Sequence, residues 1–442
     1  MKKILTFFLL LAAGAAAQAQ PASGEPWTLQ NCIQYALDHN IKVQQSALTV
    51  EQREISYNTA RNSRLPGVSA SASQNFSFGR GLTADNTYAN ANTTNTSFSL
   101  GADMTLFNGL RINNNIALSK LDLQAATQDL EKARDDIRVA VANAYMQIVY
   151  KEEILAVAQR QVEIDSLQVD RLESMLQNGK AAQADVASQE ATLAQSRLTA
   201  VQAKGNLQIA RLELAQLLEL PTPEGFEVAV PDNLDPNRLL PGTPEQIYEE
   251  ALGIKPAVQA EETRLAYAER NIALAKSGYM PSLSLNGGIG SNYYTSSNLP
   301  STNFFTMLGN NFSQYVGLSL NIPIFSRMNN RNQVRSARVR YDQQLLQLED
   351  VKKQLYKEIQ KAWYNANNAQ AKFVSSQQAE AAAAQSFELM QAKYENGKAS
   401  VTEFNESKNR YLKASSDLAQ ARCEALYQIG LLDFYRGKEI TL

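Results

Sequence analysis

The tetrapeptide Asn-Gly-Lys-Ala occurs twice in this chain, beginning at Asn178 and at Asn396, 218 positions apart in 442 residues. The similarity extends beyond the two turns. The stretch "ARNSRLPGVSAS" from Ala60 resembles "AKSGYMPSLSLN" from Ala275, and "MTLFNGLRINN" resembles "IPIFSRMNNRN". A repeat period this long predicts a duplicated domain rather than a solenoid of short repeats.

Composition divides the chain into four predicted segments. A basic start, an apolar core and the small-x-small site Ala17-Gln18-Ala19 are typical of an exported protein's signal peptide. The stretch from Leu220 to Pro244 carries six of the 13 prolines, which predicts a linker with a short strand at "FEVAV". The predicted segments are a signal peptide at 1–19, a first structural repeat at 20–219, a Pro-rich linker at 220–243 and a second structural repeat at 244–442.

Each copy is expected to run helix, strand, strand, long helix, turn, helix. In the first copy the first helix is predicted from Leu29 to Arg64, and the long helix from about Asn108 to Gln177. A helix of that length would extend about 105 Å. The long helix carries an apolar heptad repeat and a second apolar stripe. Their members are Val141, Ile148, Leu155, Val162, Val169 and Leu176 in the repeat, and Ile154, Val157, Ile164 and Leu167 in the stripe.

The heptad period is shorter than the helical repeat, so the seam must coil left-handed around a neighbour. Two seams on one helix favour a helix packed between two neighbours, as in a ring of helices built from coiled-coil hairpins. An ordinary antiparallel coiled coil remains open, because heptads do not fix the number of helices.

The predicted strands alternate apolar residues with small polar ones. In "TSFSLGADMTLF" the apolar phase includes Phe98 and Leu100, and "QYVGLSLNIPIF" repeats that phase up to Phe325 at the same offset. Val68 and Leu283 begin partner strands of the same kind. Long polar links join the strands. The pattern fits a soluble sandwich or a transmembrane β-barrel, in which apolar and polar positions alternate.

Four strands are too few to close a barrel. Lipid forbids an open sheet edge, because unpaired backbone groups would have no water there. The sheet is therefore either soluble or shared between chains. Three chains would supply twelve strands to one barrel.

The overall composition argues against several classes of function. There are 42 basic and 44 acidic residues, one histidine and two cysteines. This balance gives no sign of a nucleic-acid partner, and no constellation suited to catalysis, a metal or a cofactor is present. His39 stands alone and is expected at the surface. Cys32 and Cys423 are expected at different heights along the helices and therefore unpaired.

These features together resemble the TolC family of outer-membrane efflux proteins. The resemblance covers the mature chain and rests on the duplicated element order, on "LPG" and "MPS" before strands, on "LFNG" and "IPIFS" after them, and on both "NGKA" turns. It implies a homotrimer with a shared twelve-stranded barrel in the outer membrane and a helical tunnel across the periplasm. It also implies docking to a periplasmic adaptor (membrane fusion) protein and, through the adaptor, to an inner-membrane transporter.

Acidic residues follow both turns. Ser400 and Glu403 have the spacing of a capping box, and Asp185 lies in a first helical turn, where the helix dipole favours an anion. Glu403 and Glu406 are three residues apart and share a helix face. In the family, acids at the positions of Asp185, Glu403 and Glu406 form constriction rings, and Tyr394 matches a tyrosine of the tip-closing network.

The chain departs from the family pattern at three of these positions. The family has aspartates where Glu403 and Glu406 stand, and arginine at the position of Ala399. The closing network implied for Tyr394 therefore lacks that arginine here. A threefold set of glutamates would attract cations, repel anions and titrate as a coupled set with some pKa values raised.

The turns themselves are expected to be helix C-caps, in which glycine adopts the left-handed conformation. They would lie at the far tips of two helical hairpins. The predicted adaptor-docking residues are Asn178, Gly179, Lys180, Asn396, Gly397 and Lys398. The two lysines have an alternative interpretation as solvated side chains near helix ends.

The sequence therefore predicts a passive trimeric exit duct of an efflux or type I secretion system. It would lie in the outer membrane, contact outer-membrane lipid and extend into the periplasm. The alternative is a periplasmic coiled-coil protein with a structural or adhesive role and no pore. An adhesive rod would not need apolar strands repeated in both copies, so the strand phase favours the channel.

Overall fold

The structure is a computed structural model that describes residues 26–82, 87–221, 226–229, 236, 238, 240–297, 300 and 302–440. The predicted signal peptide and much of the predicted linker lie outside the described residues. The described chain forms two compact units. Their residues are 26–49, 127–259 and 349–440 in unit 1, and 50–126 and 260–348 in unit 2. Each unit therefore draws on both predicted repeats.

The two long helices of the first half have counterparts of equal length in the second half. The two longest have 67 residues each, and the helix that follows each of them has 35. These four are α3 Arg111–Gln177, α4 Gln183–Leu217, α8 Asn329–Glu395 and α9 Val401–Tyr435. Helix α3 begins three residues after the predicted start, because Gly109 and Leu110 have positive φ angles of 64° and 65°. None of the described helices has a stretch long and apolar enough to cross a membrane.

The prediction of one helix from Leu29 to Arg64 is wrong. The segment forms α1 Leu29–His39 and α2 Ile41–Asn62, with Asn40 between them in an extended conformation. The Asn40 side chain donates to the Leu217 carbonyl oxygen at 3.1 Å and accepts from the Lys42 amide at 3.0 Å. Asn40 thus caps α2 and ties the break to the end of α4.

The second copy breaks at the corresponding place, between α5 Pro244–Ile254 and α6 Pro256–Lys276. Lys255 is extended there, as expected of a residue before proline. Its ammonium donates to the Phe434 carbonyl oxygen at 2.9 Å. The 3₁₀ turn η1 Ser277–Tyr279 follows α6.

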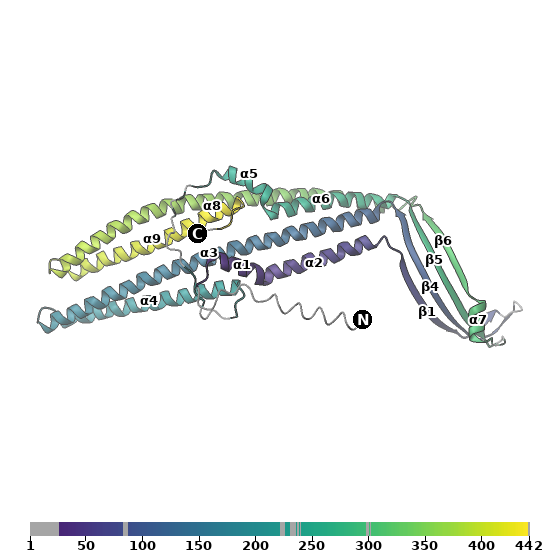
Figure 1. The fold of residues 1–442 in the computed structure, drawn as a ribbon, viewed down its shortest axis with the longest axis horizontal. Coiled ribbons are helices and arrows are strands. Elements are labelled where there is room, and N and C mark those ends of the chain that lie inside the picture. The colour runs from purple at the N-terminus through teal and green to yellow at the C-terminus, as the bar shows by residue number, and fades with distance from the viewer. Residues whose placement is uncertain are drawn as a thin grey trace. The chain divides into compact units, whose positions relative to one another are not determined.

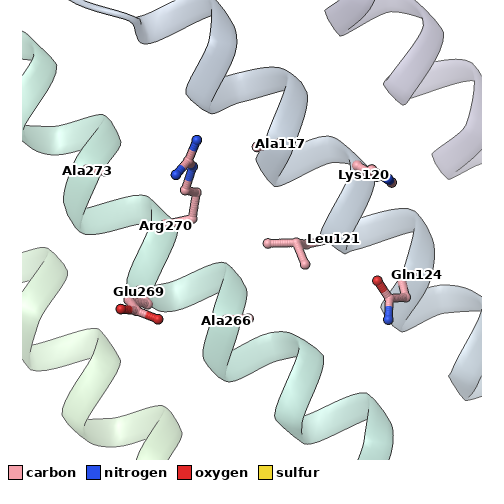
Figure 2. A pocket seen from close by; sticks show the side chains of 8 residues that line it. All are labelled: Ala117, Lys120, Leu121, Gln124, Ala266, Glu269, Arg270 and Ala273. Carbon is pink, nitrogen blue, oxygen red and sulfur yellow. The ribbon is translucent and has the colours of Figure 1, made fainter.

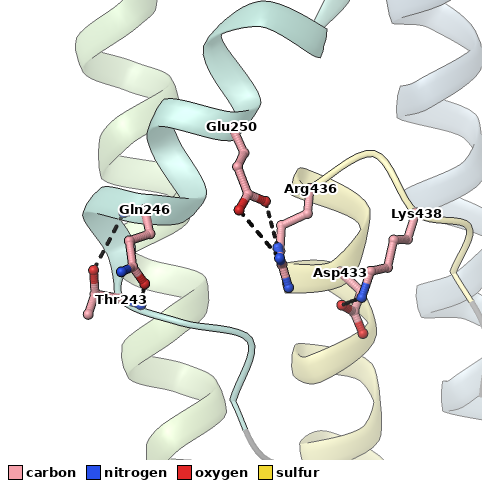
Figure 3. A network of polar contacts seen from close by, with 6 residues as sticks. All are labelled: Thr243, Gln246, Glu250, Asp433, Arg436 and Lys438. Carbon is pink, nitrogen blue, oxygen red and sulfur yellow. Dashed lines mark hydrogen bonds and ion pairs between the residues drawn. The ribbon is translucent and has the colours of Figure 1, made fainter.

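A polar network ties α5 to the end of α9 (Figure 3). The Arg436 guanidinium donates to both Glu250 carboxylate oxygens, at 2.7 and 3.3 Å. Thr243 and Gln246 form the capping box that begins α5. The C-terminus of α9 is thereby fixed to the short helix of the second repeat.

The apolar residues of α3 pack as the heptad repeat predicts. Val141 and Ile148 are fully buried, Val169 is buried, and Leu155, Val162 and Leu176 are half-buried. The single exposed member of the second stripe is Leu167.

The N-terminal segment and the linker meet through one short parallel pairing instead of a full strand. Trp27 forms an isolated β-bridge with Val228, and the Tyr145 hydroxyl donates to the Trp27 carbonyl oxygen at 3.3 Å and to that of Ala229. Tyr145 on α3 therefore fastens both segments to the helical core.

The sheet of unit 2 is antiparallel, in the order β1-β4-β5-β6 (Figure 1). Its strands are β1 Gly67–Ser77, β4 Thr93–Asn108, β5 Ser282–Ser296 and β6 Ser313–Asn321. Strands β1 and β6 are the edges, and among the described residues each is paired on one side only.

The strand register confirms the predicted amphipathic faces. On one face Ala70, Leu100 and Ile289 lie in one row across three strands, and Leu285 pairs with Leu318. On the other face the hydroxyls of two serine pairs hydrogen bond at 2.7 Å. These pairs are Ser71 with Ser99 and Ser73 with Ser97. One face is thus mainly apolar, with Gln314 on β6 at the end of the first row, and the opposite face is mainly small and polar.

Two details differ from the prediction. Strand β6 ends at Asn321 rather than Phe325, because Pro323 lacks the amide hydrogen that a ladder needs. The links expected as polar loops contain short elements. These are a hairpin of β2 Arg80–Leu82 and β3 Tyr88–Asn90, and the helix α7 Phe304–Asn310.

Both cysteines are free, as expected, and both are buried; His39 is exposed, as expected. Burial raises the pKa of the Cys32 thiol to about 12 and that of the Cys423 thiol to about 11. Both thiols therefore stay protonated and unreactive near neutral pH.

Candidate functional site

The first hairpin turn ends α3 with the predicted glycine cap. Gly179 has φ 68°, its amide donates to the Leu176 carbonyl oxygen at 2.9 Å, and the Lys180 amide donates to that of Met175 at 2.8 Å. The Asn178 side chain donates to the Ser174 carbonyl oxygen at 2.7 Å. Paired bonds of this kind satisfy the last helical carbonyls.

The second turn repeats this geometry at the end of α8. Gly397 has φ 69°, and its amide donates to the Tyr394 carbonyl oxygen at 3.0 Å. The Lys398 amide donates to the Lys393 carbonyl oxygen at 2.9 Å, and the Asn396 side-chain amide donates to the backbone carbonyl oxygen one turn earlier at 2.7 Å. The prediction that both Asn-Gly pairs are helix C-caps is confirmed.

The helices that leave the turns begin differently. Ser400 and Glu403 form a full capping box: the Glu403 amide donates to the Ser400 hydroxyl at 3.2 Å, and the Ser400 amide donates to the Glu403 carboxylate at 2.8 Å. The bonds from the Ser400 amide and hydroxyl hold the pKa of Glu403 below its usual value. In the first hairpin Ala182 has no hydroxyl, so only the Ala182 amide to Asp185 carboxylate bond forms, at 3.2 Å.

Glu406 has an ordinary partner on its own helix. Its carboxylate pairs with Arg410 one turn along α9, and both side chains are well exposed. Exposed pairs at this spacing contribute only about 0.3–0.5 kcal/mol. Glu406 is therefore solvated in the single chain and stands one turn beyond the capping glutamate Glu403.

Tyr394 is 8% exposed and stacks on Phe404 of α9, with ring centroids 4.8 Å apart. The Arg171 guanidinium of α3 lies 4.7 Å from the Tyr394 ring centroid and donates to the carbonyl oxygens of Tyr394 and Glu395 at 3.1 and 2.9 Å. Burial raises the pKa of the Tyr394 hydroxyl, Arg171 opposes this rise and Asp185 adds to it. Arg171 thus ties the second tip to the first hairpin.

A buried ion pair joins the same two hairpins along the helices. The Lys408 ammonium on α9 contacts the Asp165 carboxylate on α3, with side chains 1% and 0% exposed. The Ser196 hydroxyl on α4 donates to the same carboxylate, and the Gln189 amide does so at 3.4 Å. Both charges are therefore compensated inside the helix packing, as buried charges require.

Unit 2 has a groove of about 530 Å³ between α3 and α6 (Figure 2). Leu121 and Arg270 point into the gap between the helices, whereas Lys120 and Glu269 point away from it. Among the described residues no group of three His, Cys, Asp or Glu side chains could hold a metal ion.

A protein-family model described as "Outer membrane efflux protein" matches residues 32–219 and 247–428. The chain belongs to this family of outer membrane efflux proteins. The outer membrane efflux protein BepC of Brucella suis biovar 1 (strain 1330) is 22% identical over 384 residues, 86% of this chain and 78% of BepC. Outer membrane protein TolC of Escherichia coli (strain K12) is 24% identical over 436 residues, 96% of this chain and 84% of TolC.

The solved structure of the outer membrane protein VceC from Vibrio cholerae has the same fold. Its TM-score is 0.77 at 18% sequence identity, covering 93% of this chain and 97% of VceC. The predicted family resemblance and the predicted fold class are therefore confirmed. Efflux-family membership places the chain in the outer membrane, extending into the periplasm, as a passive channel rather than an enzyme. A structural or adhesive coiled coil without a pore is not favoured.

Within this efflux family, two features at the tips could not be foreseen from the motifs. Arg171 approaches Tyr394 from α3, and Ala399, in the turn before α9, packs against the cluster that contains Tyr394 and Phe404. Asp165 did carry a signal, because it lies seven residues from each of the buried residues Ala158 and Leu172. A charge at a heptad core position indicates a buried partner.

Proposed function

We propose that three copies of this chain form an outer-membrane channel, the passive exit duct of a tripartite efflux or type I secretion system. The supporting observation is a four-stranded sheet with two open edges and one mainly apolar face. Lipid offers no partner to backbone groups at an open edge, and four strands do not close on themselves. Three copies joined edge to edge provide twelve strands, with the apolar face against outer-membrane lipid.

Exposed apolar residues on two helices support the same assembly. Helix α2 exposes Ile41, Leu48 and Ile55, which are seven residues apart, and α8 exposes Val339 and Leu346 at the same interval. Heptad seams of this kind need a facing helix. Neighbouring copies of a homotrimer provide one, and their helices continue the barrel as a tunnel.

The two hairpin tips form the tunnel mouth in this proposal. Asp185, Glu403, Glu406 and Tyr394 form its constriction. The remaining tip residues meet a periplasmic adaptor protein, which connects the duct to an inner-membrane transporter. Those residues are Asn178, Gly179, Lys180, Asn396, Gly397 and Lys398. The exposure of Lys180 and Lys398 supports an electrostatic contribution to docking. The duct requires no cofactor and no nucleic acid.

The duplication underlies this arrangement. We assign the first repeat to 20–219 and the second to 244–442, joined by the linker at 220–243 and preceded by a signal peptide at 1–19. The equal lengths of the corresponding long helices support this division.

The test is the conductance of the purified protein in planar lipid bilayers, with its mass in detergent measured by light scattering. We expect a trimer that requires detergent for extraction and forms ohmic, cation-selective pores. Neutralising the constriction in Glu403→Gln/Glu406→Gln should lower the cation preference, because the ring loses its charge.

Ser400→Ala is the matched control. It removes the capping hydroxyl and keeps both carboxylates, so it should keep the selectivity if the glutamates act on ions rather than on the helix. A protein that extracts without detergent, remains monomeric and never conducts would rule out the channel.

A further inference from the structure

The four-stranded sheet contains a single charged side chain, that of Asp103. The other residues of β1, β4, β5 and β6 are apolar, glycine, or neutral and polar. A charge within a membrane-embedded sheet is costly unless it faces water, and so it marks a functional position by default.

The register places Asp103 on the polar face. Its row across the sheet is Gly67, Asp103, Asn286 and Gly317, and the neighbouring apolar row contains Val68 and Ala102. The hydrogen-bonded serine pairs belong to the same polar face, because alternate residues of a strand share a face.

The surroundings of this carboxylate are open. Gly67 stands directly opposite, where an added Cβ would lie 3.3 Å from the Asp103 Oδ1. The next polar row holds Ser69, Gly101, Gly288 and Tyr315, and the Tyr315 ring lies across Gly288, where an added Cβ would be 2.9 Å from a ring carbon. Within the part of the chain that the structure describes, the Asp103 carboxylate has no hydrogen bond or ion pair.

These observations exclude a structural explanation of the kind found for the other acids singled out here. Asp185 and Glu403 cap helices, Glu406 pairs with Arg410, and Asp165 is neutralised by Lys408. Asp103 does none of these, and its two ladder partners are the uncharged residues Gly67 and Asn286.

We propose that Asp103 is a second determinant of ion selectivity in the pore. The inference rests on the proposed trimeric channel: if the polar face lines the lumen, three copies place three Asp103 carboxylates around it. Such a ring raises the local concentration of cations and lowers that of anions. It acts within the barrel and is separate from the acids at the helical tips.

The test measures the potassium-to-chloride permeability ratio from reversal potentials in a salt gradient, using the full-length purified channel. At about 0.1 M salt the Debye length is about 10 Å, so ring charges still act across part of the lumen. We expect Asp103→Asn to lower the ratio about threefold, both in the wild-type background and in Glu403→Gln/Glu406→Gln. At about 1 M salt, where the Debye length is about 3 Å, the difference should disappear.

The ladder partner of Asp103 provides a matched control. In Asp103→Asn/Asn286→Asp the carboxylate moves to the neighbouring strand in the same row, so the ratio should return toward the wild-type value. An unchanged ratio in Asp103→Asn at low salt would overturn the inference while the channel still conducts. A permeability ratio that falls in Asp103→Asn and stays low in Asp103→Asn/Asn286→Asp would also overturn the inference, because the change would then reflect the fold and not the charge. A wild-type chain that never conducts would refute the proposed channel itself, and this inference with it.

Discussion

The two hairpin tips have the same backbone and different side-chain support. Each ends a 67-residue helix with an Asn-Gly cap, with the glycine φ at 68° in one and 69° in the other. The first tip begins its next helix with Ala182 and half a capping box, whereas the second has Ser400 and a complete one. The second is also held by Phe404 against Tyr394 and by Arg171 from the first hairpin. The turn residues alone therefore determine the turn geometry, whereas the stability of each tip depends on the side chains that cap it and pack against it.

The largest expected effect comes from the ion pair that links the hairpins. Lys408→Met leaves the fully buried Asp165 carboxylate without a counter-charge. Removing one partner of a buried pair typically costs about 3–5 kcal/mol. Urea unfolding of the purified protein in detergent measures this loss, and the second hairpin should lose its attachment first.

The double variant Asp165→Asn/Lys408→Met removes both charges and keeps an amide oxygen for the Ser196 hydroxyl. It should be more stable than Lys408→Met alone, because no uncompensated charge remains. Equal stabilities would mean that the lysine acts through packing and not through its charge.

Arg171→Gln is the next largest perturbation and acts on the second tip alone. It removes two charge-assisted bonds to the carbonyl oxygens of Tyr394 and Glu395, and the contact with the Tyr394 ring. Because Arg171 is half-buried, we expect the second tip to lose about 1–2 kcal/mol of stability. Amide hydrogen exchange should become faster at residues 394–398 and stay unchanged at 178–180. Equal changes at both tips would contradict the asymmetry.

The local features of the tips and of the sheet were predictable because they depend on a few neighbouring residues. Asn-Gly fixed the caps, Ser400 with Glu403 fixed a helix start, and the period-two alternation fixed the faces of the strands. Each of these follows from residues within one turn or one strand.

The contacts between hairpins were not predictable in the same way. Asp165 and Lys408 are 243 residues apart, and only the register of the packed helices brings them together. The break at Asn40 was missed because no proline or glycine marks it, although Pro256 follows the corresponding break in the second repeat. Tertiary partners, here the Leu217 and Phe434 carbonyl oxygens, stabilise both breaks.

The glycine caps should respond equally in the two tips. Gly179→Ala and Gly397→Ala each place a Cβ on a left-handed residue, and neither Cβ would meet another atom within 4 Å. Each substitution should then lower the free energy of unfolding by about 1 kcal/mol, which is the cost of the left-handed backbone conformation alone. Urea unfolding of the two variants, compared with wild type, tests this equality. A clearly larger loss for Gly397→Ala would show that the neighbouring side chains also constrain the turn.

The smallest effects exchange the helix caps between the tips. Ser400→Ala leaves the second tip with only half a capping box, as in the first, and should lower the free energy of unfolding by about 1 kcal/mol. Ala182→Ser gives the first tip a hydroxyl cap and should raise the free energy of unfolding by about 0.5–1 kcal/mol. The bonds from Ser400 hold the pKa of Glu403 low, so their stabilising effect is present above the usual glutamate pKa and is lost as pH falls through the lowered value. An NMR titration of Glu403 should therefore show its pKa shifted upward in Ser400→Ala. A pKa that does not move would mean that the backbone amide of residue 400 alone holds the carboxylate, and the two tips would then differ less than their sequences suggest.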